Sequence, residues 1–238
     1  MLLKKILLAT VALVLIAFLT LAGMAWSRLQ PEVNLLELPD NLISHAGNRG
    51  QDLLQNANAK IDYAPLAENF ESQELRSFCG VASGVAVLNA LGRNIDQKSF
   101  FDHDSPDAKS RMDVTFGGMT LDEFATLLAA HGGVVEVYHA DSIDVEEFRE
   151  IMRRNLNEPG NYIVVNYQRE ELGQRRVGHI SPVAAYDEES ELVLILDTAS
   201  YNYPPTWVPV TQLHEAMKAI DPSSGKSRGF VEVSGLAD

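Results

Sequence analysis

The chain has 238 residues, of which 46% are hydrophobic and 22% are charged. This composition excludes an intrinsically disordered chain and fits one domain of ordinary size with an appendage. Acidic residues outnumber basic ones by 33 to 19, a net charge of −14, which disfavours nucleic acid and anionic membrane surfaces as partners.

The chain begins with an uncharged, apolar run from Ile6 to Trp26, preceded by Lys4 and Lys5. At ~1.5 Å per residue this run spans about 30 Å, the thickness of a bilayer's hydrocarbon core. A cleaved signal peptide and a retained anchor are both open, and we favour the anchor because the run is long for a signal sequence. The lysines place the body outside the cytoplasm. We expect an exported, periplasmic protein, held at the inner membrane by residues 6–26 if they are kept.

After this segment (residues 1–26), residues 27–58 predict a polar spacer with a short helix near its end, and residues 59–234 predict the folded domain. Hydrophobic patterns predict helices over 79–91, 121–131, 145–155 and 211–220, and strands over 134–138, 162–167, 178–186 and 192–197. Thr120 and Glu123 form a capping-box pattern at the second helix. Helices first and an antiparallel hairpin later favour an α+β fold.

One cysteine occurs in the sequence, Cys79, within "SFCGVASGVAVLNALG". In an exported chain it cannot form an internal disulfide, and such a thiol is a liability unless it has a function. It begins a predicted helix, where free backbone N–H groups and the helix dipole lower the pKa of a thiol. The neighbouring Gly80 would let a substrate approach the backbone. A small buried hydrophobic cysteine is the alternative.

The last two predicted strands carry a histidine and an aspartate that could form a catalytic triad with this thiol. His179 begins one strand, with Gly178 leaving room beside it, and Asp197 ends the next. A three-residue loop between the strands would place Asp197 opposite His179, where a carboxylate can orient the imidazole. If the loop has this length, the residues predict a nucleophilic triad with Cys79.

Gln73 lies six residues before Cys79, and its side-chain amide could donate to an oxyanion. A surface glutamine is the alternative. No metal site is predicted, because His103 in "FFDHDSPD" has no second ligand at a suitable spacing. We assign no role to His45, His131, His139 or His214.

Six segments together resemble the phytochelatin synthase family, in particular its short bacterial members with only the catalytic domain. They are "SFCGVASGVAVLNALG", "GGMTLDEF", "VVNYQREELGQ", "GHISPVAAYDEESELVLILDTA", "YPPTWVPVTQLHEAM" and "GKSRGF". They follow the family's order over roughly residues 61–232. The resemblance implies a papain-like cysteine-peptidase fold, with a helical part carrying Cys79 and an antiparallel sheet carrying His179 and Asp197.

The resemblance also implies a glutathione γ-glutamylcysteinyltransferase. Cys79 would attack the Cys–Gly amide of glutathione and release glycine. The acyl-enzyme would pass to water, giving γ-glutamylcysteine, or to a second glutathione, giving phytochelatin. His179 would act as general acid and base, Asp197 as its orienting partner and Gln73 as oxyanion donor. Because no cysteine-rich extension of the plant type follows, we expect hydrolysis to dominate over transfer.

The same resemblance implies that Asp221 and Arg228 bind the γ-glutamyl moiety, with Arg169 as a weaker candidate for that site and Gly178 beside it. The implied partners are glutathione and γ-glutamyl peptides, with a homodimer as one option for the assembly. No prosthetic group is expected. Cd²⁺ or Zn²⁺ would act as an activator or within a metal–glutathione substrate, in keeping with metal detoxification. Two other functions stay open: an export-linked papain-like peptidase, and an inactive module that binds glutathione or metal thiolates.

Overall fold

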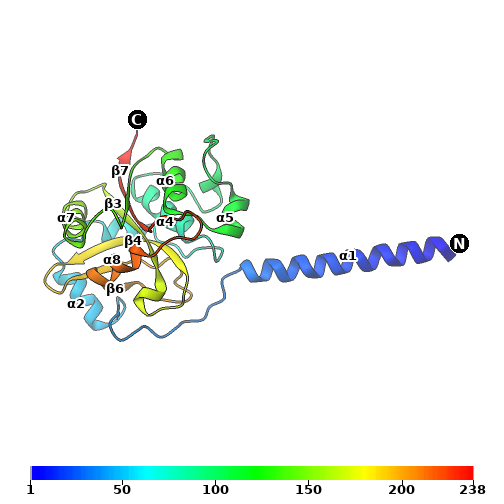
Figure 1. Cartoon of the computed structure of the whole chain (residues 1–238), viewed down its shortest axis with the longest axis horizontal. Coiled ribbons are helices and arrows are strands. Elements are labelled where there is room, and N and C mark those ends of the chain that lie inside the picture. Colours follow the sequence, from blue (N-terminus) through cyan, green and yellow to red (C-terminus); the bar gives the residue numbers. More distant parts are fainter. Residues whose placement is uncertain (1, 238) are drawn as a thin grey trace.

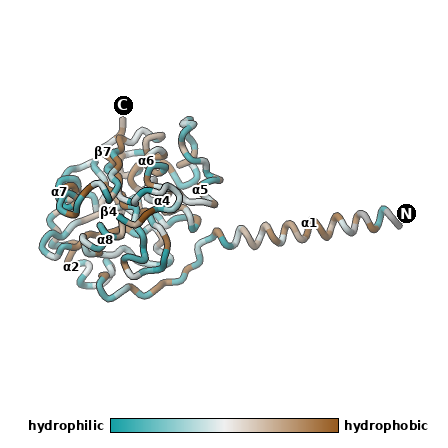
Figure 2. Tube along the Cα trace, viewed as in Figure 1, coloured by the Kyte–Doolittle hydropathy of each residue, from teal (hydrophilic) through white to brown (hydrophobic). Residues whose placement is uncertain are grey.

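The computed structural model describes residues 2–237, in which one long helix extends from a folded body (Figure 1). This helix, α1 (Leu2–Leu29), is about 42 Å long at 1.5 Å per residue. Among the described residues it is the one helix long and apolar enough to cross a membrane, with a mean hydropathy of 2.7 and nothing of its apolar stretch buried (Figure 2). Its length and composition fit a signal sequence and a membrane anchor alike.

An antiparallel sheet of seven strands forms the centre of the body, in the order β1-β6-β5-β4-β3-β7-β2. The strands are β1 (Ile43–Ser44), β2 (Gly133–His139), β3 (Tyr162–Gln168), β4 (Gly178–Asp187), β5 (Leu192–Ile195), β6 (Thr206–Pro209) and β7 (Gly229–Leu236). The central strands β3 and β4 are buried along nearly their whole length. They read as continuous apolar runs because helices cover both faces of the sheet.

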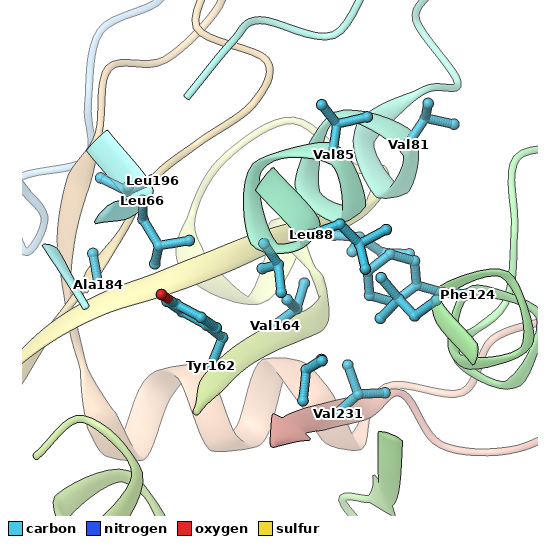
Figure 3. Packing of buried hydrophobic residues seen from close by; sticks show 14 of the residues in the cluster. Leu66, Val81, Val85, Leu88, Phe124, Tyr162, Val164, Ala184, Leu196 and Val231 are labelled. Carbon is cyan, nitrogen blue, oxygen red and sulfur yellow. The ribbon is translucent and has the colours of Figure 1, made fainter. Parts of the chain in front are cut away.

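The remaining helices divide between the two faces of this sheet. They are α2 (Asn48–Asn56), α3 (Tyr63–Glu68), α4 (Cys79–Ala90), α5 (Arg111–Gly117), α6 (Leu121–Ala130), α7 (Val145–Asn155) and α8 (Val210–Lys218), with 3₁₀ turns at Ser99–Phe101 and Arg169–Leu172. Val164 packs in a cluster with residues of α4 and α6 (Figure 3). Its neighbour Val165 packs in a second cluster with residues of α7 and α8, so the strand's alternation builds two cores.

The predicted α+β class is confirmed, and most predicted elements exist. The helix over Val145–Asn155 has the predicted bounds. The capping box is present, since the Thr120 hydroxyl accepts from the Glu123 N–H (3.3 Å) and the Glu123 carboxylate accepts from the Thr120 N–H (2.8 Å). The prediction missed α3, α5, β1, β6 and β7. Most of these are short, and residues 206–209 include a proline, which weakens a strand signal.

The predicted register of the β4–β5 hairpin is wrong. Tyr186 pairs with Val193 instead of Ser190, because the turn is longer than three residues. A bulge between Val183 and Ala185 shifts the register once more. The direct cross-strand argument for His179 therefore fails.

Part of the segment expected to be a spacer packs into the body. Leu53 and Ala57 belong to the core beside α4, and the Trp207 indole donates to the carbonyl of Gly50 (3.0 Å). The packed body thus begins before residue 59, within the segment expected to be a spacer.

Candidate active site

Cys79 is the first residue of α4 and is partly exposed. The Ser83 hydroxyl, one turn later, lies 2.7 Å from the Cys79 carbonyl oxygen and 3.0 Å from that of Ile180, which ties the start of the helix to β4. A Cβ on Gly80 would lie 2.5 Å from the Met119 sulfur. Gly80 thus lets the side chain of Met119 pack directly against the start of α4.

His179, the second residue of β4, is buried and lies against Asp197. Its Nε2 is 3.0 Å from Asp197 Oδ1, although the ring N–H is not aligned as a hydrogen bond, so the contact is best described as an ion pair. Asp197 follows the end of β5, where Leu196 donates to the Pro182 carbonyl (3.0 Å). This backbone hydrogen bond holds the segment after β5 beside β4, so the side chains of Asp197 and His179 come into contact. Within the sheet, His179 pairs with Tyr167 of β3.

A buried arginine, Arg169, also contacts the Asp197 carboxylate. Arg169 Nη2 lies 2.7 Å from both carboxylate oxygens, and the Ala199 N–H donates to Oδ1 (2.9 Å). Burial alone would raise the pKa of Asp197, but the charges of Arg169 and His179 outweigh it and hold that pKa far below its ordinary value. Asp197 is therefore a carboxylate throughout the physiological range.

The thiol and the imidazole have pKa values shifted in opposite directions. Burial would raise the pKa of Cys79, but its hydrogen bond to His179, the charge of His179 and backbone N–H groups lower it. Burial and Arg169 would lower the pKa of His179, but Asp197 and Cys79 raise it. Both shifts favour a thiolate–imidazolium pair.

Two pockets flank this pair. The first, the Arg228 pocket, has a volume of about 420 Å³ and contains Cys79 and His179 in its wall. The second, the Arg175 pocket, has a volume of about 430 Å³ and also reaches His179. The two pockets share His179 and its neighbours Val177 and Gly178 in their walls, and each could hold part of a substrate.

A pair of opposite charges lies in the Arg228 pocket. Arg228 Nη1 is 3.1 Å from Asp221 Oδ2 and donates to Asn166 Oδ1 (2.8 Å). A Cβ on Gly178 would lie 2.5 Å from Arg228 Nη1, so only glycine leaves room for the guanidinium. Among the described side chains, Asn166 Nδ2 and Arg228 Nε are buried without a hydrogen-bond partner.

Of the predicted residues, Cys79, Gly178, His179, Asp221 and Arg228 share this pocket. The sequence reading missed Asn166. Its signal was an amide inside the otherwise apolar buried strand "YIVVNYQ", where a polar side chain needs a reason to be present.

Arg169 and Gln73 line the Arg175 pocket instead. Arg169 was expected near Asp221. Its guanidinium instead donates hydrogen bonds to Asp197 and to Gln174 (2.7 Å each). The Gln73 amide nitrogen donates to the carbonyls of Leu75 (2.9 Å) and Arg76 (2.8 Å). Both amide protons are thereby used, so donation to an oxyanion would require this amide to reorient.

Comparisons with known proteins agree with the sequence resemblance. A family model described as phytochelatin synthase matches residues 33–230. The chain is 32% identical over 202 residues to glutathione gamma-glutamylcysteinyltransferase 1 of Lotus japonicus, covering 81% of this chain and 40% of the relative. For the protein of the same name from Arabidopsis thaliana the identity is 33% over 175 residues, 71% of this chain and 36% of the relative.

The glutathione gamma-glutamylcysteinyltransferase of Schizosaccharomyces pombe is 28% identical over 206 residues, 82% of this chain and 49% of the relative. The matched region thus spans less than half the length of these relatives. Because the family model covers most of the folded body, including every residue of the candidate active site, the chain belongs to the phytochelatin synthase family.

Proposed function

We propose that the chain is a glutathione γ-glutamylcysteinyltransferase-like enzyme with a papain-like fold and Cys79 as its nucleophile. One observation carries the proposal: a partly exposed cysteine at a helix start shares a pocket with a histidine held by Asp197 and with the Asp221–Arg228 pair. This arrangement places an activated thiol beside a carboxylate and a guanidinium. These two charges complement the α-ammonium and the α-carboxylate of an amino acid.

The Arg228 pocket suits the γ-glutamyl end of glutathione. Arg228 would bind the α-carboxylate and Asp221 the α-ammonium, as opposite charges with matching hydrogen bonds. Asn166 Nδ2 offers a further donor for the carboxylate. An internal peptide segment has neither charge, so the pair favours glutathione over a general peptide substrate.

The reaction would proceed through a thioester. The Cys79 thiolate attacks the carbonyl carbon of the Cys–Gly amide, and the C–N bond breaks as the His179 imidazolium protonates the glycine amine. His179 then removes a proton from water or from the amine of a second glutathione, and that nucleophile displaces the thiolate. The products are γ-glutamylcysteine or phytochelatin.

Asp197 and Arg169 would position the imidazole. Asp197 contacts Nε2 of His179, which leaves Nδ1 for the thiol. The Cys79 N–H, free of an intrahelical partner at the first position of α4, would donate to the oxyanion, joined by Gln73 if its amide reorients. Cd²⁺ or Zn²⁺ would act as an activator or enter bound to glutathione thiolates, the ligands that these ions prefer.

We further propose that α1 is a retained anchor and that the body is periplasmic. The support is a single apolar helix near the N-terminus, preceded by lysines.

The deciding experiment is glycine release from glutathione by the purified full chain. We expect turnover by the wild type and none by the folded Cys79→Ala variant. Asp221→Asn should raise KM for glutathione more than it lowers kcat, because Asp221 binds and does not react. Cleavage of unrelated peptides without glycine release from glutathione would favour a peptidase, and neither activity would favour a binding module.

A further inference from the structure

The point where α1 leaves the body is fixed by contacts. The carbonyl of Leu29 accepts from the Arg76 N–H (3.0 Å), and that of Gln30 accepts from Arg76 Nε (2.8 Å). Leu29 also packs against the core and lines the Arg228 pocket. The end of α1 is therefore part of the wall of the candidate active site.

Three large apolar side chains are exposed around this point. Phe116 (72% exposed) and Val177 (52%) line the same pocket as Leu29. Met112 (71%) lies one turn before Phe116 on α5, so both side chains share one face of that helix. Single exposed apolar residues are ordinary, but these three gather where the membrane-length helix α1 ends. We call Met112, Phe116 and Val177 the α5 face.

With α1 across a bilayer, as proposed above, the α5 face would lie at the level of the lipid headgroups. The apolar run of α1 ends at Trp26, a residue type enriched at membrane interfaces. Leu29 follows three residues later, about 5 Å along the axis. Figure 1 shows α5 on the side of the body from which α1 extends.

Basic side chains accompany the α5 face. Arg111 precedes Met112, and Arg175 and Arg176 precede Val177, and all three arginines are exposed. Arg176 is paired with Glu170 at 3.2 Å. Such residues attract phosphate headgroups. These exposed arginines give the α5 face cationic contacts for phosphates, although the chain as a whole carries a net charge of −14.

We propose that the α5 face docks into the interfacial layer of the bilayer that holds α1. The Arg228 pocket, which contains Cys79, would then open at the membrane surface. This inference rests on the proposed retention of α1 as an anchor. Phe116 and Met112 enter the boundary between headgroups and acyl chains, as apolar residues of interfacial helices do. The arginines remain at the phosphates.

The test measures tryptophan quenching by lipids brominated on the acyl chain close to the glycerol. The full chain is reconstituted into vesicles of phosphatidylcholine with a minor fraction of phosphatidylglycerol. Wild-type Trp26 reports whether α1 is embedded. A Trp26→Phe background, which keeps the buried Trp207, carries Phe116→Trp as the probe. Gln55→Trp is the matched control, because Gln55 is exposed and belongs to α2, which Figure 1 shows on the side of the body away from α1.

We expect the Phe116→Trp variant to be quenched about as strongly as wild-type Trp26, and the Gln55→Trp variant no more than the background. Adding Met112→Gln should weaken the quenching of the probe. Quenching of Trp26 without quenching of the Phe116→Trp variant would overturn the docking, as would equal quenching of the Gln55→Trp variant. An unquenched Trp26 would overturn the anchor and the docking together, while glycine release tests the proposed chemistry independently.

Discussion

Asp197 has two cationic neighbours, and a substitution there affects each of them differently. Asparagine cannot balance the imidazolium of His179, so we expect kcat to fall about 10²- to 10⁴-fold. It also leaves the Arg169 guanidinium, which is 3% exposed, without its carboxylate. Breaking a buried pair in this way costs roughly 3–5 kcal/mol of the free energy of unfolding.

A double-mutant cycle separates these two effects. Arg169→Met combined with Asp197→Asn removes both buried charges, so the double variant should be more stable than the sum of the single losses, with a coupling of at least about 1 kcal/mol. The lost rate should not return. Urea unfolding and glycine-release kinetics measure the two quantities. Additive stability losses would contradict the pairing, and Arg153→Met at an exposed ion pair with Glu188 is the control.

The pH profile should reflect the opposed shifts of Cys79 and His179. Activity needs the thiolate, whose pKa is lowered, so the acid limb should lie below the ordinary thiol value of about 8.5. It also needs the imidazolium, whose pKa is raised, so the alkaline limb should lie above about 6.5. We expect a bell-shaped dependence of kcat/KM, with apparent values that belong to the pair.

Arg169 offers a check on the sign of this effect. Its charge lowers the pKa of His179, so Arg169→Met should move the alkaline limb to higher pH. A limb that moves to lower pH, or a profile without an acid limb below about 8.5, would refute the thiolate–imidazolium pair.

At the scale of elements, periodicity predicted the long helices and the central strands, because their apolar residues repeat over several turns or pairs. It could not predict the β4–β5 register, since a one-residue change in the turn moves every pairing. Glu191 adopts φ 55° in that turn, which no sequence rule for a glutamate indicates. His179 and Asp197 nevertheless meet. Both lie beyond the last pair of β4 with β5, where their side chains can approach each other from the adjacent strand ends.

Arg169 shows a second limit of the sequence. Residue types predict a cationic side chain near a carboxylate substrate, but which buried carboxylate it contacts depends on tertiary packing. The 3₁₀ turn Arg169–Leu172 places it under Asp197 and against the ring of Tyr203, at 5.1 Å. Asn166 was missed for a similar reason, since its role follows from the position of Arg228.

The start of β4 provides a test of the Arg228 pocket. Gly178→Ala would place a methyl group 2.5 Å from Arg228 Nη1, so the guanidinium must shift. We expect KM for glutathione to rise about tenfold, equal to ~1.4 kcal/mol, with a smaller change in kcat. Gly47→Ala, whose new Cβ has its nearest contact at 3.7 Å, should change neither. An unchanged KM in Gly178→Ala would argue against substrate binding at Arg228.

For the molecule as a whole, charge is distributed unevenly. The net charge is −14, yet Arg76, Arg169, Arg175 and Arg176 line one of the two pockets beside His179. Arg76, Arg169 and Arg176 are paired with the carboxylates of Glu32, Asp197 and Glu170, so the attraction of an anion into this cleft rests mainly on Arg175. Glutathione, the proposed substrate, carries two carboxylates and would respond to this charge.

The segment between α1 and the body links the two parts of the molecule physically. Asn34 and Leu36 donate from their N–H groups to the carbonyls of Tyr201 and Asn202, both at 2.9 Å. Glu32 lies 3.8 Å from Arg76, and Glu32 and Asn34 line the Arg175 pocket. The segment is thus a structural part of the candidate site.

Two truncations distinguish the anchor from this segment. Removing residues 1–26 deletes only the exposed helix, so glycine release in solution should match that of the full chain. Removing residues 1–36 also deletes the two backbone hydrogen bonds to residues 201 and 202 and one wall of the pocket. We expect that variant to fold, with KM for glutathione raised by about tenfold or more, because the loop after Asp197 loses its outer support. Steady-state kinetics of the two purified proteins measure this difference. Equal KM values would show that residues 27–36 do not shape the site, and loss of activity in the shorter truncation would mean that α1 itself contributes to catalysis.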